Sequence, residues 1–135
     1  MATEESNIFK RVQMAVSKAG SRLFRVNVGK AWTGKKILKN KNGSITILEP
    51  RPFSTGVPKG YADGTGWTPL IINKEMVGIK VAVFTAIETK TKKGRASKDQ
   101  ENFIEQVKLS GGIAGVVRSE DEAIKLIENY RKGND

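Results

Sequence analysis

The chain has 135 residues, of which 38% are hydrophobic and 28% charged, so it has the size and composition of one soluble globular domain with a modest core. It contains no cysteine and no histidine, which excludes disulfides, thiolate or imidazole metal sites, and Ser–His or Cys–His catalysis. The net charge is +10, and residues 1–60 hold 12 Lys and Arg against 3 Asp and Glu. This surplus favours a surface that binds a polyanion, nucleic acid above all, although extra surface lysine that only aids solubility also fits.

The first elements follow from hydrophobic spacing. Apolar residues at helical spacing predict a helix over about 4–19 that ends at Gly20. Alternation over 22–28 predicts a strand, and residues 36–38 and 45–48 around Asn42-Gly43 predict a hairpin. Residues 49–69 carry all four prolines and predict a loop-rich segment without long elements.

The second half predicts two strands, at 70–73 and 79–88, and the later one is apolar on both faces like a central strand. Ser97 and Gln100 have capping-box spacing and predict a helix that ends at Gly111-Gly112. A strand over 113–117 follows, and Ser119 with Glu122 predicts a second capping box for the last helix, with Ile124 among its inward residues. The fold class is therefore α/β, a single domain over 1–135 with a central mixed sheet flanked by helices.

The chemistry concentrates at the end of the most apolar strand. Glu88 and Lys90 are two apart and share one side of a strand, where a carboxylate can bind a hard cation and lysine can orient water. Asp63, flanked by glycines, is the best second carboxylate, because adjacent strands of one hairpin would bring it near Glu88. An exposed ion pair for Glu88 and Lys90, and a turn role for Asp63, are the alternatives for each piece alone.

At these motifs the chain resembles the VRR-NUC (virus-type replication-repair nuclease) family of the PD-(D/E)xK superfamily. The resemblance runs from the first helix through the strand at 24–29, Gly60-Tyr61-Ala62-Asp63-Gly64, Ile87-Glu88-Thr89-Lys90, Gln100 and Gly111-Gly112. It is similar above all to stand-alone phage members. Ala62 stands where the superfamily pattern has proline, and Phe9 stands where relatives often carry glutamine.

The resemblance implies a restriction-endonuclease-like core and a Mg²⁺- or Mn²⁺-dependent DNA endonuclease. It implies that Asp63, Glu88 and Glu5, with the carbonyl of Thr89, bind the metal. Lys90 would position the attacking water, and Gln100 would support the site, although Gln100 could instead serve only the helix cap. Branched DNA, Holliday junctions especially, is the implied substrate of a homodimer in the cytoplasm of a bacterial host. A flap or linear-duplex nuclease, and a non-catalytic DNA-binding or packaging accessory, are the alternatives.

Two basic zones are candidates for phosphate contact, with a solvated loop as the alternative. The first follows the site and comprises Lys92, Lys93, Arg95 and Lys98. The second surrounds the first strand and the hairpin and includes Arg25, Lys30, Lys35 and Lys36, with Arg22, Lys39 and Lys41. Trp32 and Trp67 can stack on bases, but packing or an oligomer interface is favoured for each. No segment predicts a membrane span.

Overall fold

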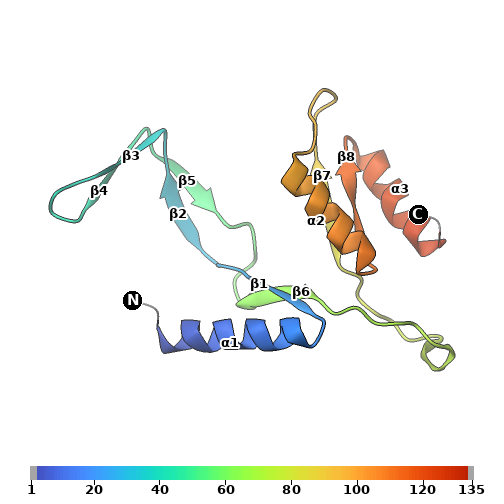
Figure 1. The fold of residues 1–135 in the computed structure, drawn as a ribbon. Coiled ribbons are helices and arrows are strands. Elements are labelled where there is room, and N and C mark those ends of the chain that lie inside the picture. Colours follow the sequence, from blue (N-terminus) through green and yellow to red (C-terminus); the bar gives the residue numbers. More distant parts are fainter. Residues whose placement is uncertain (1–2, 134–135) are drawn as a thin grey trace. The chain divides into compact units, whose positions relative to one another are not determined.

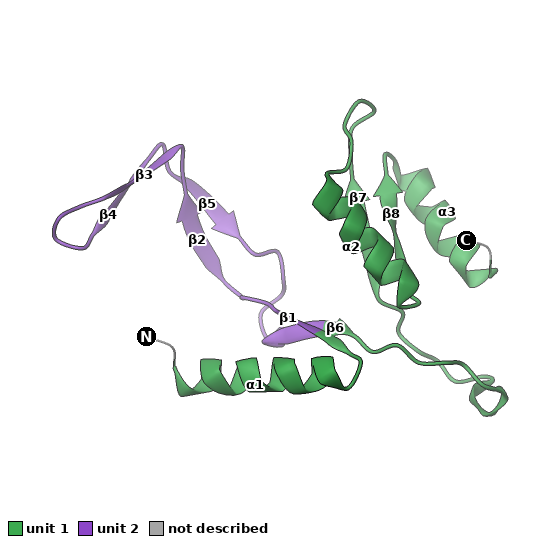
Figure 2. Ribbon diagram, viewed as in Figure 1, with its two compact units in different colours: residues 1–22, 66–135 green, residues 23–65 purple. Residues whose placement is uncertain are grey.

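The computed structural model describes residues 3–133, which divide into two compact units (Figures 1 and 2). One unit holds the described residues up to Arg22 and from Gly66 onward, and the other holds Leu23–Thr65. The chain contains both parallel and antiparallel strand pairs together with helices, which confirms the α/β class. Within residues 3–133 the strands form four two-stranded sheets, where the sequence predicted one central sheet.

The first helix confirms its prediction, and the strand after it is shorter than predicted. Helix α1 spans Glu4–Lys18, and the Thr3 hydroxyl caps it by accepting from the backbone N–H of Ser6 at 3.1 Å. Strand β1 spans only Arg22–Arg25 and pairs with β6, Gly64–Trp67. The predicted continuation to residue 28 is wrong, because Gly29 has a φ of 140° and the chain turns there into a new strand.

Residues 30–54 form an antiparallel ribbon of four short strands, which we call the ribbon. Strand β2 (Lys30–Thr33) pairs with β5 (Arg51–Ser54), and β3 (Lys36–Lys39) pairs with β4 (Ile45–Leu48). The predicted hairpin is confirmed, and Gly43 at its turn has a φ of 87°. Strands β5 and β6 lie in the segment predicted as loop-rich, and each has only four residues.

The segment after β6 differs from its prediction. Residues 70–73 form no strand, and a single 3₁₀ turn, η1, follows at Lys74–Met76. Strand β7 spans Thr85–Thr89 instead of beginning at residue 79. Its partner explains the difference: β8 starts at Ile113, directly after the glycines that end a helix, and pairs Thr85 with Ile113, so residues 79–84 have no ladder partner in β8.

The core of the chain lies in a β–α–β unit, as predicted. Strands β7 and β8 (Ile113–Val117) are parallel, and helix α2 (Lys98–Leu109) connects them and packs on both, while α3 (Glu120–Arg131) packs on β8. The buried apolar residues are Val107, Ile113, Ala114 and Val117. A Cβ at Gly112 would lie 2.8 Å from both the Phe84 carbonyl oxygen and Val107 Cγ1, so this turn requires glycine.

Helix α3 corrects two details. Ser119 caps it by accepting from the Glu122 N–H, but the Glu122 carboxylate accepts from the N–H of Arg118 and not from that of Ser119, so the second capping box is wrong. Ile124 was expected to face inward and is 60% exposed. Leu126 takes the inward position: a Cβ at Gly115 would meet its side chain at 3.2 Å.

Candidate active site

Glu88 and Lys90 lie together at the end of β7, on the same side of the strand, as their two-residue spacing predicted. Glu88 is the fourth residue of the strand, and Lys90 follows its last residue, with the Lys90 N–H donating to the Val117 carbonyl at 3.1 Å. The Lys90 Nζ lies 3.2 Å from Glu88 Oε1. The two side chains are 23% and 31% exposed, so this is a half-buried ion pair and not the fully exposed one considered from sequence.

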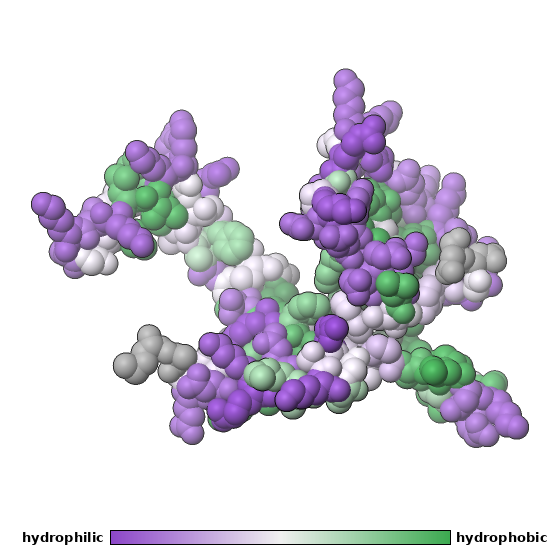
Figure 3. All heavy atoms as spheres, viewed as in Figure 1, coloured by the Kyte–Doolittle hydropathy of each residue, from purple (hydrophilic) through white to green (hydrophobic). Residues whose placement is uncertain are grey.

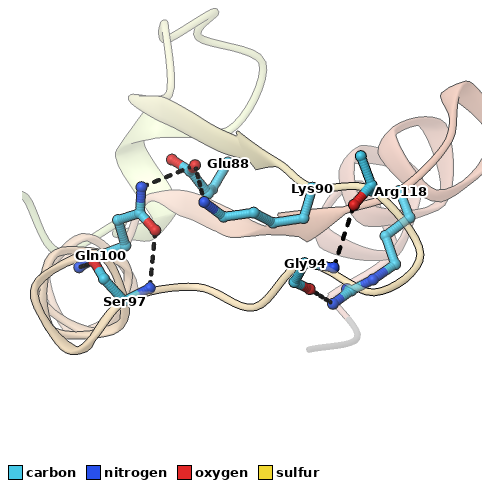
Figure 4. A network of polar contacts seen from close by, with 7 residues as sticks. Glu88, Lys90, Gly94, Ser97, Gln100 and Arg118 are labelled. Atoms are coloured by element: carbon cyan, nitrogen blue, oxygen red, sulfur yellow. Dashed lines mark hydrogen bonds and ion pairs between the residues drawn. The ribbon is translucent and has the colours of Figure 1, made fainter.

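Gln100 joins the pair from helix α2 (Figure 4). Its Nε2 donates to Glu88 Oε1 at 2.9 Å, and its Oε1 accepts from the Ser97 N–H at 2.9 Å. Gln100 therefore makes both of the contacts that the sequence offered as alternatives. Its amide oxygen completes the helix cap, and its amide nitrogen contacts the Glu88 carboxylate. The capping box fixes the side chain that in turn fixes Glu88.

A pocket of about 290 Å³ opens between β7 and α2 at this point. It is lined by Ala86, Ile87, Glu88, Asp99, Gln100, Phe103 and Ile104. Asp99 therefore lines the same pocket as Glu88, which the sequence did not indicate, since its place in the capping motif explained it as an acidic first-turn residue. The sequence could have indicated Asp99 as a site residue, because it directly precedes Gln100 in the first turn of α2.

The first basic zone lies on the loop between β7 and α2 and on the first residue of α2, and its four cations are exposed: Lys92, Lys93, Arg95 and Lys98. The fold of the loop is held at Gly94, whose N–H donates to the Thr91 carbonyl at 3.1 Å. The Arg118 Nη2 donates to the Gly94 carbonyl at 2.7 Å (Figure 4). Arg118 was not singled out from sequence, although a charged residue directly after the apolar β8 was a signal like that of Glu88.

Of the other predicted metal ligands, Thr89 lies on β7 with Glu88, whereas Asp63 and Glu5 lie in other parts of the chain. Asp63 is exposed and immediately precedes β6 in the unit of residues 23–65, and its backbone carbonyl accepts from the Val26 N–H at 2.8 Å. Glu5 is exposed in the first turn of α1, and Thr89 is the exposed last residue of β7. Within residues 3–133, no group of three or more carboxylates is close enough to hold a metal ion. The hairpin expected to join Asp63 to Glu88 is absent, because residues 70–73 are not a strand.

The second basic zone lies mostly on the ribbon. Lys30, Lys35 and Lys36 are exposed there, as is Arg25 on β1, and Lys35 Nζ lies 3.5 Å from Glu49 Oε2. Trp32 is 64% exposed on β2. Trp67 packs instead, with its ring centroid 4.9 Å from that of Phe84 and 6.0 Å from that of Phe103, which confirms the packing role expected for it.

One of three comparisons with known proteins identifies the family of this chain. The sequence pattern of one family, described as the VRR-NUC domain, matches residues 5–121 and so includes Glu5, Asp63, Glu88, Lys90 and Gln100. Searches of curated proteins and of solved structures gave no match. Of the helices in the described part, none has the length and apolar character to cross a membrane. The chain therefore belongs to the VRR-NUC family and is a nuclease domain that acts on DNA.

Proposed function

We propose that this nuclease is a Mg²⁺- or Mn²⁺-dependent endonuclease with a preference for branched DNA such as Holliday junctions. The observation that carries the proposal is the half-buried cluster of Glu88, Lys90 and Gln100 at the end of β7. A carboxylate held by a lysine and an amide has a fixed orientation, and a fixed orientation is what a metal ligand or a catalytic group requires.

The oxygen donors assigned to the metal are of the type that a hard divalent cation takes. Glu88 Oε1 accepts from Gln100 and pairs with Lys90, so one carboxylate oxygen fixes the other in place at the rim of the pocket. We assign metal binding to Glu88 and the Thr89 carbonyl, which both lie on β7, and, on the family resemblance, to Asp63 and Glu5, an all-oxygen set of the kind that Mg²⁺ and Mn²⁺ prefer. When bound, the metal lowers the pKa of a water and offsets negative charge on the scissile phosphate.

The chain's own groups divide the remaining work. The Lys90 ammonium has donors left beyond its contact with Glu88, and these orient the attacking water and stabilise charge on the phosphate oxygens. Gln100 acts as a positioning residue, since it touches Glu88. The exposed cations of the first basic zone contact the phosphates that flank the cut; they are Lys92, Lys93, Arg95 and Lys98.

A symmetric homodimer completes the proposal. Cutting a four-way junction requires paired incisions, and a two-fold dimer supplies two equivalent sites. The chain of 14.8 kDa presents one Glu88–Lys90–Gln100 cluster, which serves one strand. Light scattering should give twice the chain mass, and a chain that stays monomeric with junction DNA bound would refute the dimer.

The decisive experiment measures cleavage of a four-way junction, a flap and a linear duplex in Mg²⁺, Mn²⁺ or EDTA. We expect cutting only with metal, fastest on the junction. Glu88→Gln should lower the rate by at least about 10²-fold and leave DNA binding in EDTA unchanged. Glu105→Gln removes an exposed carboxylate of α2 as a matched control and should cleave normally. Binding without cleavage of any substrate would establish the accessory role instead, and equal cutting of linear duplex would refute junction preference.

A further inference from the structure

The ribbon of residues 30–54 has the features of a separate DNA-binding element. Its strand pairs are joined where Lys35 donates its N–H to the Leu48 carbonyl at 2.9 Å. Gly34 permits this close approach, since a Cβ there would lie 2.6 Å from that carbonyl oxygen and would overlap the Ile47 side chain. The ribbon is therefore a two-stranded antiparallel element that continues from the β2–β5 pair into the β3–β4 pair. In the described residues, its strands pair only with one another.

Cations stand on both faces of this ribbon. Cross-strand partners share a face, so Lys36 lies with Leu48 on one face and Lys39 with Ile45 on the other. The same rule places Lys30 opposite Ser54 and Arg51 opposite Thr33, again on alternate faces. The ribbon's charged residues are Lys30, Lys35, Lys36, Lys39, Lys41 and Arg51 against the single acid Glu49. All six cations are exposed, and Lys35 alone forms an ion pair within the described residues.

The ribbon buries little of its own surface. Its large apolar side chains stay open, with Trp32 64% and Ile45 60% exposed. Figure 3 shows hydrophilic side chains projecting from this part of the chain around a small apolar patch. An isolated two-stranded ribbon is marginally stable, and like charges along it add repulsion. A polyanion that lies against both faces removes that repulsion.

We infer that the ribbon lies in the major groove of a duplex arm of the DNA substrate. The major groove of B-form DNA is wide enough for a two-stranded ribbon, and phosphates line both of its walls. Cations on both faces of one ribbon match these two walls, whereas a ribbon that packed on a protein core would keep one face free of charge. The inference rests on DNA being the substrate and is independent of the metal.

The test measures affinity for duplex DNA in EDTA against salt concentration, which separates it from cleavage. The variant is Lys36→Gln/Lys39→Gln/Lys41→Gln at the outer end of the ribbon. The loss of three phosphate contacts lowers the slope of log affinity against log salt by about 2.7, so the wild type loses about 40-fold more affinity than the variant between 50 and 200 mM salt. The control, Lys108→Gln/Lys125→Gln/Lys132→Gln, removes equal charge outside the ribbon and should keep the wild-type slope.

Two further readouts distinguish groove binding from general charge attraction. Double-stranded RNA has a major groove too narrow for side chains to read, so the ribbon variant should lose affinity for DNA and little for RNA. In a Trp67→Phe protein Trp32 is the only tryptophan, and its emission should change in step with duplex binding. An unchanged DNA slope in the ribbon variant, equal losses on DNA and RNA, or unaltered Trp32 emission during binding would each overturn the inference and leave the nuclease assignment intact.

Discussion

The β7–α2–β8 unit and the ribbon have strands of similar length but differ in how far their side chains are buried. In the first, two five-residue parallel strands are covered by α2 and bury Val107 and Ala114. In the second, four-residue antiparallel strands leave even Trp32 and Ile37 open. The difference follows from the connections: a crossover helix must pack on the strands that it joins, whereas a tight turn adds no covering layer.

Under the two proposals above, this contrast separates the residues of the chemical step from those of DNA binding. Glu88 obtains a fixed orientation from Lys90 and from Gln100, and Gln100 is itself fixed by the helix cap. Such a chain of contacts holds a reacting group within a fraction of an ångström, which catalysis requires. The phosphate contacts proposed for the ribbon's lysines need charge and reach more than exact placement, because the energy of counterion release tolerates several geometries.

The largest expected effect is on kcat, and it distinguishes Lys90→Met in the site from Lys36→Met on the ribbon. Lys90 contacts Glu88 in the site, and its loss should lower kcat by about 10²- to 10³-fold. Lys36 is exposed on β3, so its loss should weaken DNA binding and leave kcat at saturating DNA within about 2-fold. Multiple-turnover cleavage at saturating DNA measures both. Equal kcat losses in the two variants would mean that the regions do not divide the work in this way.

The second effect concerns stability. Val107 is 1% exposed, and Val107→Ala removes two buried carbons and leaves a cavity, which should cost about 2–3 kcal/mol of unfolding free energy. Ile45 on the ribbon is 60% exposed, and Ile45→Ala should cost less than about 0.5 kcal/mol. Urea denaturation followed by circular dichroism measures the two. A large loss for Ile45→Ala would show that the ribbon is covered in solution.

The same contrast explains what the sequence predicted. Local signals predicted the β–α–β unit well: the capping motif at Ser97 and the two glycines at 111–112 fix the two ends of α2, and the run at 113–117 is bounded by those glycines and by the cap of the next helix. The pairing of Glu88 with Lys90 also came from local spacing. Gln100 was also predicted from the sequence. Its double contact, with the Ser97 N–H of the cap and with the Glu88 carboxylate, depends on how α2 and β7 lie together, which the sequence did not show.

Errors fall where pairing depends on distant residues. Residues 70–73 and 79–84 have the apolar composition of strands, yet a strand needs a ladder partner, and β8 supplies one only from Thr85 onward. Asp99 and Arg118 were passed over for a similar reason, since a helix first turn and a strand end accounted for them locally. The Glu122 carboxylate accepts from the N–H of Arg118 and not from that of the cap residue, Ser119. These two N–H groups are neighbours in the chain, so residue spacing alone does not predict which one is bonded.

A third, smaller effect tests the double role of Gln100. Gln100→Glu keeps an oxygen for the Ser97 N–H, so the capping box survives, but it replaces the donor to Glu88 with a second carboxylate oxygen. We expect the cleavage rate to fall by about 10-fold and the melting temperature to stay near that of the wild type. Ser97→Ala should do the reverse, because it costs about 1 kcal/mol of stability through the lost cap and leaves the contact with Glu88. If both variants changed activity and stability in proportion, Gln100 would be only a structural residue.

The smallest effect concerns Arg118, which links the rigid unit to its basic loop. Its Nη2 holds the Gly94 carbonyl at 2.7 Å and so fixes where Lys92, Lys93 and Arg95 stand. Arg118→Lys keeps the charge but loses the planar guanidinium that makes this contact, and the loop becomes more mobile. The loss of one exposed hydrogen bond is worth about 0.5–1 kcal/mol, which corresponds to a rise in KM of roughly 2- to 5-fold with kcat unchanged. Arg118→Gln adds a loss of charge: if Arg118 acts only on the loop, both variants should show the same salt dependence of DNA binding, whereas a lower slope for Arg118→Gln alone would place Arg118 on a phosphate.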